Sequence, residues 1–237
     1  AALDTSVAPP EALADRLLEL WRRDGVGVAA GEHSYNVEIG SHLAAEGVRP
    51  WVEAASRVLL VSDQNVAPLH AAALRASLGG DSKVDLIELP AGEAHKTLGT
   101  VESIWRRASA LGADRSSLFV GLGGGVVTDI AGFAAAGWMR GVRWVAIPTT
   151  LLAMVDASVG GKTAVDLGQA KNCVGAFWQP AHVVCDVALS VTEPALGNSA
   201  LSEVVKTALI GDAALLDDLE RHADRLLARD PEVIGEV

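Results

Sequence analysis

Lysine is scarce in this chain of 237 residues, in which five lysines stand against 14 arginines. A lysine ammonium is a compact charge that binds phosphate or carries a shifted pKa, so each lysine is a candidate site residue. Two of the five, Lys162 and Lys171, lie close in sequence, one after Gly160-Gly161 and the other before Asn172. This spacing indicates an anion site for a phosphate or a carboxylate. A solvated hairpin explains the same pattern, and both interpretations stay open.

A glycine-rich turn is the second candidate, Gly121-Leu-Gly-Gly-Gly-Val-Val-Thr-Asp129, between an apolar run and a helical pattern. Glycines let the backbone approach a phosphate, and the N-terminus of a helix offers free N–H groups to an anion. The order of the glycines differs from that of the common dinucleotide fingerprint G-x-G-x-x-G. The turn therefore predicts either a nucleotide phosphate site or a tight connection between strand and helix.

Other polar side chains follow predicted strands, where ligands of α/β proteins bind. Asp63 fits either a ribose contact or a cap for the next helix. Thr149 and Thr150 fit a ligand contact or a helix cap, and taken alone capping is the better interpretation. Glu203 and Lys206 share one helical face at i, i+3, which is typical of a surface ion pair and is functional only if that face turns into a cleft.

The elements that position these residues alternate between strand and helix along most of the chain. Apolar runs and alternation predict strands over 25–30, 35–39, 57–62, 84–89, 117–122, 142–147 and 183–187, with helices over 66–78, 97–111 and 126–136. Such alternation predicts an α/β fold with a Rossmann-like, mostly parallel sheet. Two helices, over 201–210 and 213–227, then follow with no strand between them. We therefore predict an α/β domain over residues 1–192 and the start of an all-α domain over residues 193–237.

Composition limits the classes of function. Half of the residues are hydrophobic and 21% are charged, which excludes wholesale disorder. The net charge of −11 argues against nucleic acid as a partner. No apolar run approaches the ~20 residues of a membrane span, and the first residues do not resemble a signal peptide. The two cysteines, Cys173 and Cys185, form no disulfide framework, so we expect a cytoplasmic protein without a membrane partner.

The combination and order of the motifs resemble the 3-dehydroquinate synthase family of sugar phosphate cyclases. The resemblance runs from Ser34 to Ile210 and rests on SYNVEIG, SDQNVAPLH, GEAHK, GGGVVTDIAGF, WMRGV, IPTTLLAMVDASVGGKTAVD, KNCVGAFWQP and SEVVKTALI. It implies an NAD-binding α/β domain followed by a helical domain, with a divalent metal, zinc or cobalt, at their junction. It also implies a carbon–oxygen lyase of the shikimate pathway of aromatic amino acid biosynthesis. Such an enzyme converts a heptulosonate 7-phosphate to a carbocycle, eliminates phosphate and leaves NAD unchanged overall.

The resemblance assigns roles to individual residues. The implied cofactor-binding residues are Asp63, Asn65, Glu93, Lys96, Gly124, Gly125, Asp129, Thr149, Thr150, Lys162, Lys171 and Thr192. The implied substrate-binding residues are Arg140, Asp156, Lys162, Asn172 and Lys206, of which Asp156, Lys162 and Lys206 are also implied to be catalytic. Glu203 matches a metal ligand, and Arg140 matches an arginine that reaches substrate across a dimer interface, which implies a homodimer. Lys83 is the one lysine left over.

Several features depart from the family's pattern. The family's metal site needs two histidines after the glutamate, but His222 is the only histidine after Glu203. We therefore expect a longer enzyme, and NAD binding without cyclisation if the polypeptide ends at Val237. Asp166 stands where the family usually has Asn, and Thr207 where it commonly has Tyr. An aminodehydroquinate synthase or another cyclase of secondary metabolism remains an alternative, as do a metal-dependent polyol or alcohol dehydrogenase and a non-catalytic NAD-binding module.

Overall fold

A seven-stranded sheet forms the centre of the molecule. The computed structural model describes residues 23–190, 198–228 and 230–236. The sheet strands are β1 (Arg23–Val28), β2 (Tyr35–Gly40), β9 (His182–Asp186), β6 (Arg143–Pro148), β5 (Leu118–Gly123), β3 (Val58–Asp63) and β4 (Val84–Leu89), in that spatial order. All neighbouring strands are parallel except β1 and β2, which pair antiparallel. The predicted mostly parallel sheet is therefore confirmed.

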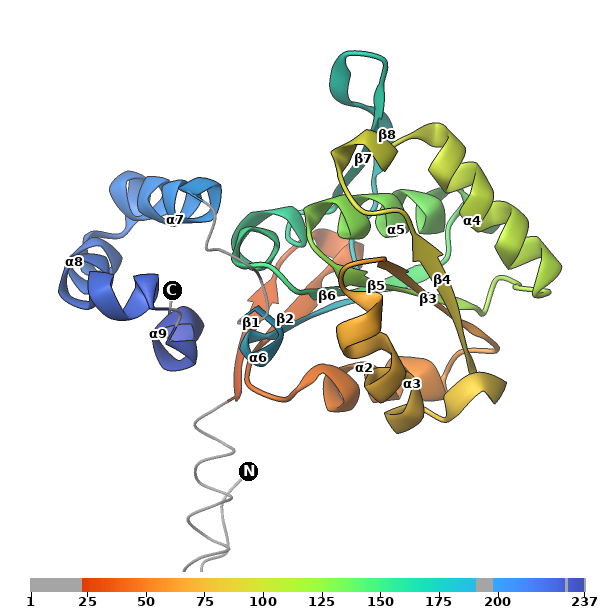
Figure 1. Ribbon diagram of the computed structural model, residues 1–237, viewed down its shortest axis with the longest axis horizontal. Helices are drawn as coiled ribbons and strands as arrows, with labels where there is room; N and C mark the ends of the chain where they lie inside the picture. The colour runs from red at the N-terminus through yellow and green to blue at the C-terminus, as the bar shows by residue number, and fades with distance from the viewer. Residues whose placement is uncertain (1–22, 191–197, 229, 237) are drawn as a thin grey trace, which may run out of the picture.

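Helices cover both faces of the sheet (Figure 1). The helices are α2 (Ala44–Glu53), α3 (Ala72–Ser77), α4 (Leu98–Ala110), α5 (Gly125–Gly137), α6 (Val187–Ser190), α7 (Asn198–Gly211), α8 (Ala213–Leu227) and α9 (Pro231–Glu236). Short 3-10 or π segments are η1 (Gly31–His33), η2 (Ala67–Ala71), η3 (Gly80–Ser82), η4 (Glu93–His95), η5 (Trp138–Arg140) and η6 (Ala153–Ala157). Among the described residues, none of these helices is long and apolar enough to cross a bilayer.

The sheet separates two apolar cores. On one face α4 and α5 pack against it, and Ile104, Phe119 and Ile130 are completely or almost completely buried there. On the other face α2 and α3 pack against it around Val48 and Leu60. Burial of each large apolar side chain stabilises the fold by about 1.5–3 kcal/mol, so the short apolar strands are stable only when both faces are covered.

A two-stranded hairpin projects from the α5 side of the sheet. It consists of β7 (Lys162–Leu167) and β8 (Ala170–Phe177), which pair antiparallel with a register shift between Val165 and Leu167. The solvated-hairpin interpretation of this segment is thus confirmed in its geometry. Contacts between α5 and β7 hold the hairpin against the domain, and Figure 1 shows it extending beyond the helical layer.

The C-terminal helices form a third apolar core. Leu151 and Val187 of the sheet domain pack there with Val204 of α7, Leu219 of α8 and Ile234 of α9. The predicted helices over 201–210 and 213–227 are present, and Asp212 caps α8 by accepting the N–H groups of Ala214 and Leu215. The predicted domain boundary between residues 192 and 193 lies outside the described residues.

Close packing between α5 and the hairpin generates a stability prediction. A Cβ at Gly132 would collide with the Thr163 side chain and lie 3.0 Å from Trp144 Cζ2. We therefore expect Gly132→Ala to lower the free energy of unfolding by about 1–3 kcal/mol through overpacking. Gly99→Ala in α4 is the control, because its Cβ would lie 3.6 Å from its nearest neighbour and alanine favours the helix. Urea unfolding measures both variants; equal stability of Gly132→Ala and the parent would contradict the packing account.

Candidate functional site

A cleft of about 690 Å³ opens between the N-terminal end of α5, segment η6 and the hairpin. Its volume lies within the range of small-molecule sites. Of the residues singled out from the sequence, it is lined by Glu93, Lys96, Gly125, Asp129, Asp156, Lys162 and Asn172. These residues come from segments far apart in the chain, so the fold brings together one polar site at the carboxyl end of the sheet.

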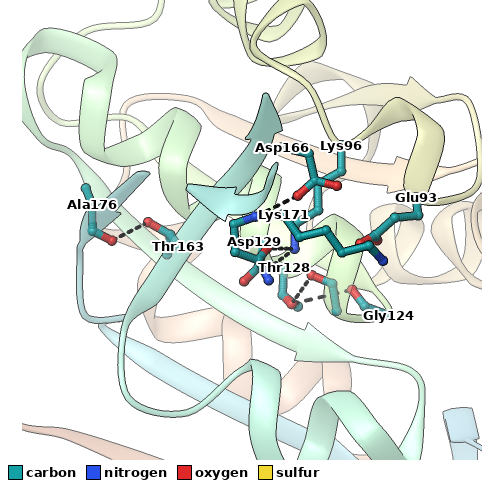
Figure 2. A network of polar contacts seen from close by, with 11 residues as sticks. Glu93, Lys96, Gly124, Thr128, Asp129, Thr163, Asp166, Lys171 and Ala176 are labelled. Atoms are coloured by element: carbon teal, nitrogen blue, oxygen red, sulfur yellow. Dashed lines mark hydrogen bonds and ion pairs between the residues drawn. The ribbon is translucent and has the colours of Figure 1, made fainter. Parts of the chain in front are cut away.

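A buried lysine lies at the centre of the cleft wall. Lys96 is 5% exposed, and its Nζ lies 2.5 Å from Asp129 Oδ2. The same Nζ donates to Asn172 Oδ1 at 2.5 Å. Figure 2 shows Lys96 and Asp129 pointing toward one another between α5 and the hairpin. One ammonium group therefore links a residue of the implied cofactor set with one of the implied substrate set.

Local structure explains where Lys96 lies. The turn η4 starts after Gly92, whose φ of +101° favours glycine, and it ends at Lys96. The next residue, Thr97, caps α4 by accepting the N–H of Thr100 at 3.2 Å. Because the end of η4 and the start of α4 are both fixed, the backbone of Lys96 is held in one position. From this position its side chain extends to α5.

A second ion pair lies at the mouth of the cleft. Lys171 Nζ lies 3.2 Å from Glu93 Oε1, and both side chains are substantially exposed. Figure 2 shows the long Lys171 side chain extending from the hairpin toward Glu93. Exposed pairs of this kind contribute at most about 1 kcal/mol, so Lys171 can exchange Glu93 for an anionic ligand at little cost.

The glycine-rich turn combines close packing with an open helix end. A Cβ at Gly123 would lie 2.7 Å from Val127, and one at Gly125 would lie 3.2 Å from Ala157 Cβ. Gly124 is the N-cap of α5, and no side-chain cap bonds the first turn of that helix. The tight-connection interpretation is thus confirmed, and the helix end retains the N–H groups that an anion site needs.

An orphaned hydroxyl lies beside this turn. Thr149 is 4% exposed, and its N–H donates to Gly123 O. In the part of the chain that the structure describes, Thr149 Oγ1 has no hydrogen-bond partner. A buried unpaired hydroxyl is unfavourable, so Thr149 Oγ1 is available to bond to a ligand atom or a water molecule. The uncapped helix end, the orphaned hydroxyl and the cleft volume together fit a bound dinucleotide.

Other residues chosen from the sequence have local structural roles or lie away from the cleft wall. Asp63 Oδ1 accepts the N–H groups of Asn65 and Val66, so this carboxylate caps the segment after β3. Thr150 Oγ1 accepts the N–H of Ala153 at 3.2 Å, which confirms capping. Arg140 is exposed at the end of η5, and Asn65 is exposed as well. Thr192 lies outside the described residues.

Two contacts that sequence reasoning missed hold the loops of the cleft. The Asp166 carboxylate accepts the N–H of Asn172 at 2.7 Å. The Tyr35 hydroxyl accepts the N–H of Gly160 at 2.9 Å, next to the turn that leads into Lys162. Asp166 stood out in the sequence because the family usually has Asn there, whereas Tyr35 carried no signal beyond its place in a strand.

A metal does not fit the described residues alone. Within residues 23–190, 198–228 and 230–236, no group of three or more His, Cys, Asp or Glu side chains is placed to hold a metal ion. Glu203 on α7 forms an ion pair with Lys206 one turn later. A catalytic zinc site typically has three protein ligands, so the implied role of Glu203 needs ligands from beyond these residues.

Burial dominates the electrostatics of Asp129. Desolvation raises the pKa of the Asp129 carboxyl, the hydrogen bond and charge of Lys96 oppose that rise, and the charges of Glu93 and Asp156 add to it. The folded state therefore binds the Asp129 proton more tightly than the unfolded chain does. Its contribution to stability is present below the ordinary pKa of aspartate and is lost as the pH rises toward the raised value.

Substitution of Lys96 tests how burial and the lysine together set the pKa of Asp129. We expect Lys96→Met to raise the pKa of Asp129 further, because the variant removes the hydrogen bond and the positive charge that lower it. The measurement is a carboxyl ¹³C NMR titration of Asp129. Lys83→Met is the control, since Lys83 donates to Ala55 O outside the cleft. An unchanged or lower pKa of Asp129 in Lys96→Met would contradict the arrangement.

Known proteins share this sequence and architecture. Residues 86–197 match the family model of the 3-dehydroquinate synthase N-terminal domain. The 3-dehydroquinate synthase of Halorhodospira halophila is 46% identical over 209 residues, which are 88% of this chain and 58% of that protein. The corresponding enzyme of Teredinibacter turnerae is 44% identical over 86% of this chain and 57% of its own length. The chain thus spans less than two thirds of the length of these curated relatives.

A solved structure agrees with these matches. The 2-epi-5-epi-valiolone synthase of Streptomyces hygroscopicus subsp. jinggangensis, solved with NAD+ and Zn2+ bound, superposes with a TM-score of 0.76 at 32% identity, over 87% of this chain and 59% of that one. A 2-deoxy-scyllo-inosose synthase solved with carbaglucose-6-phosphate, NAD+ and Co2+ superposes with a TM-score of 0.67 at 30% identity, over 72% of this chain and 48% of that one. On sequence and fold together, the chain belongs to the 3-dehydroquinate synthase family of sugar phosphate cyclases.

Proposed function

We propose that this chain forms the NAD-binding part of a 3-dehydroquinate synthase, a lyase that converts a heptulosonate 7-phosphate to a carbocycle with elimination of phosphate. The observation that carries the proposal is the single cleft that collects Lys96, Asp129, Lys162 and Asn172. Relatives named 3-dehydroquinate synthase at 44–46% identity support the same reaction. An alcohol dehydrogenase is disfavoured because that class lacks the cluster of Lys162, Lys171 and Asn172.

On the cofactor side, we assign the pyrophosphate of NAD to the N-terminal end of α5, at Gly124 and Gly125. The free N–H groups and the positive end of the helix dipole suit two negative charges. Thr149 adds a hydroxyl that has no partner among the described residues. The remaining assignments follow the family: Asp63 and Asn65 on the ribose side, then Glu93, Lys96, Asp129, Thr150, Lys162, Lys171 and Thr192.

On the substrate side, we assign anion recognition to the exposed Lys162 at the start of β7. Lys162 and Asp156 both line the cleft, so a phosphorylated sugar acid beside them meets the Lys162 ammonium and the Asp156 carboxylate. Lys162 neutralises the departing phosphate, while Asp156 and Asn172 orient hydroxyl groups by hydrogen bonds. NAD+, when bound, supplies a temporary acceptor for a hydride from a secondary alcohol.

We propose that the metal site includes Glu203 and further ligands from beyond the described residues. The solved relatives contain Zn2+ or Co2+, and we propose zinc or cobalt here with Glu203 as one ligand. Because the described residues do not form a metal site, no step is assigned to it. Lys206, which pairs with Glu203, would bind the substrate carboxylate once the metal holds Glu203.

The finer assignments follow from the same family. We propose a place in the shikimate pathway, in the cytoplasm, with a helical metal-binding domain starting near residue 193. We also propose a homodimer, in which the exposed Arg140 reaches the substrate phosphate of the neighbouring subunit. An aminodehydroquinate synthase stays the second candidate, favoured by Thr207 at a position where dehydroquinate synthases commonly have Tyr.

The orphaned hydroxyl provides the test of NAD binding. We expect Thr149→Val to weaken NAD+ binding by about tenfold, because the cofactor loses a hydrogen bond in a buried site. Thermal stability of the ligand-free variant should stay the same or rise, since Thr149 Oγ1 has no partner among the described residues and valine removes a buried unpaired hydroxyl. Isothermal titration calorimetry measures the affinity. Thr128→Val is the matched control, because that buried hydroxyl already bonds to Gly125 O; equal loss of affinity in both variants would contradict the assignment.

Lysine substitution tests the substrate side. We expect Lys162→Met to weaken binding of heptulosonate 7-phosphate to the NAD-loaded protein by at least about tenfold, because a charge-assisted contact is lost. Lys83→Met should keep the parent affinity, since Lys83 lies outside the cleft. Equal affinities of Lys162→Met and Lys83→Met would contradict the role of Lys162. Net accumulation of NADH with this substrate would instead favour a dehydrogenase.

A further inference from the structure

The hairpin has an irregular backbone where it meets the cleft. Asn172 lies within β8 with a φ of +53°, in the left-handed region. The pairing of β7 with β8 shifts register between Val165 and Leu167, directly opposite this residue. Asparagine tolerates this region better than most side chains, yet the conformation is unfavourable unless neighbouring contacts hold it. The contact that holds Asn172 therefore controls where its side chain points.

Asp166 supplies that contact. Its Oδ1 accepts the backbone N–H of Asn172 at 2.7 Å, which joins the two strands at the shifted register. Its own N–H donates to Lys96 O at 2.8 Å, and Thr97 forms an isolated parallel bridge with Asp166. Asp166 thus bonds to the Asn172 backbone through its side chain and to the η4–α4 connection through its main chain. Figure 2 shows Asp166 and Lys96 close together at this point.

The position of Asn172 decides the surroundings of Lys96. The Lys96 ammonium has two partners, the Asp129 carboxylate and the Asn172 amide oxygen, each at 2.5 Å. If the Asn172 backbone left the left-handed region, the amide oxygen would turn away and the ammonium would lose one partner. A buried lysine with fewer hydrogen bonds is held less firmly. A displacement of Asn172 on the hairpin would therefore also change the position of Lys96 on the cofactor side of the cleft.

We propose that Asp166 is a positioning residue of this site. It holds Asn172 in the left-handed conformation, and through the Asn172 amide oxygen it keeps Lys96 oriented between the cofactor and substrate sides. The structural part of this proposal rests on the hydrogen bonds alone. Its functional part rests on the proposed function, because that function supplies the ligand, NAD+. It requires an acceptor oxygen at this position but no negative charge, so asparagine should serve in its place.

The structural part is tested by NMR on the full chain. We expect Asp166→Ala to speed hydrogen exchange at the backbone N–H of Asn172 by at least about tenfold, because its hydrogen bond to a charged acceptor is lost. Asp166→Asn should keep most of the protection. Gln169→Ala at the exposed hairpin tip is the matched control and should leave the Asn172 amide unchanged. Unchanged exchange in Asp166→Ala would overturn the proposal.

The functional part is tested by the NAD+ affinity of the same variants. We expect Asp166→Ala to bind NAD+ about fivefold to tenfold more weakly, with Asp166→Asn within twofold of the parent, as one lost hydrogen bond implies. If Asp166→Asn fails as badly as Asp166→Ala, the hydrogen-bond account is wrong. If the parent itself does not bind NAD+, the proposed function fails, while hydrogen exchange at Asn172 still decides the role of Asp166.

Discussion

The ion pair between Lys96 and Asp129 holds the candidate site together. Its side chains are 6% and 14% exposed, so both charges are largely removed from water. Loss of one partner from such a pair typically destabilises a protein by about 3–5 kcal/mol, because the other charge stays buried alone. Lys96 also reaches Asn172 on the hairpin. The pair therefore fixes the helix α5, the η4–α4 connection and the hairpin relative to one another, and the cleft lies between these elements.

The cofactor side shows how packing and chemistry share the same residues. In the glycine-rich turn, Val127 lies too close for a side chain at Gly123, the last residue of β5, and a Cβ at Gly125 would press on Ala157 at 3.2 Å. The same turn leaves the first N–H groups of α5 without a side-chain cap. The closely packed turn thus also leaves an open helix end, which suits the anion that we propose there. The metal side differs, since the described residues provide Glu203 but no cluster of ligands around it.

Sequence patterns predicted the parallel sheet well because its buried strands are short apolar runs, such as Val58–Asp63 and Leu118–Gly123. They missed α2, because Gly47 and Pro50 interrupt the helical pattern, although Gly47 is required where Glu38 and Val184 pack closely. Motif order identified the residues of the cleft, but not how they connect. The bond from Asp166 to Asn172 depends on a register shift and a left-handed residue, and no periodicity in the sequence reports either feature.

The central claim is that NAD binds in the cleft between α5 and the hairpin. Hydrogen–deuterium exchange of the full chain with and without NAD+ tests this claim most directly, because it maps the contact without a mutation. The account predicts slower exchange at residues 122–130 and 162–177, at the helix end and along the hairpin. Protection confined to α7, α8 and α9, or no protection anywhere at saturating NAD+, would contradict it.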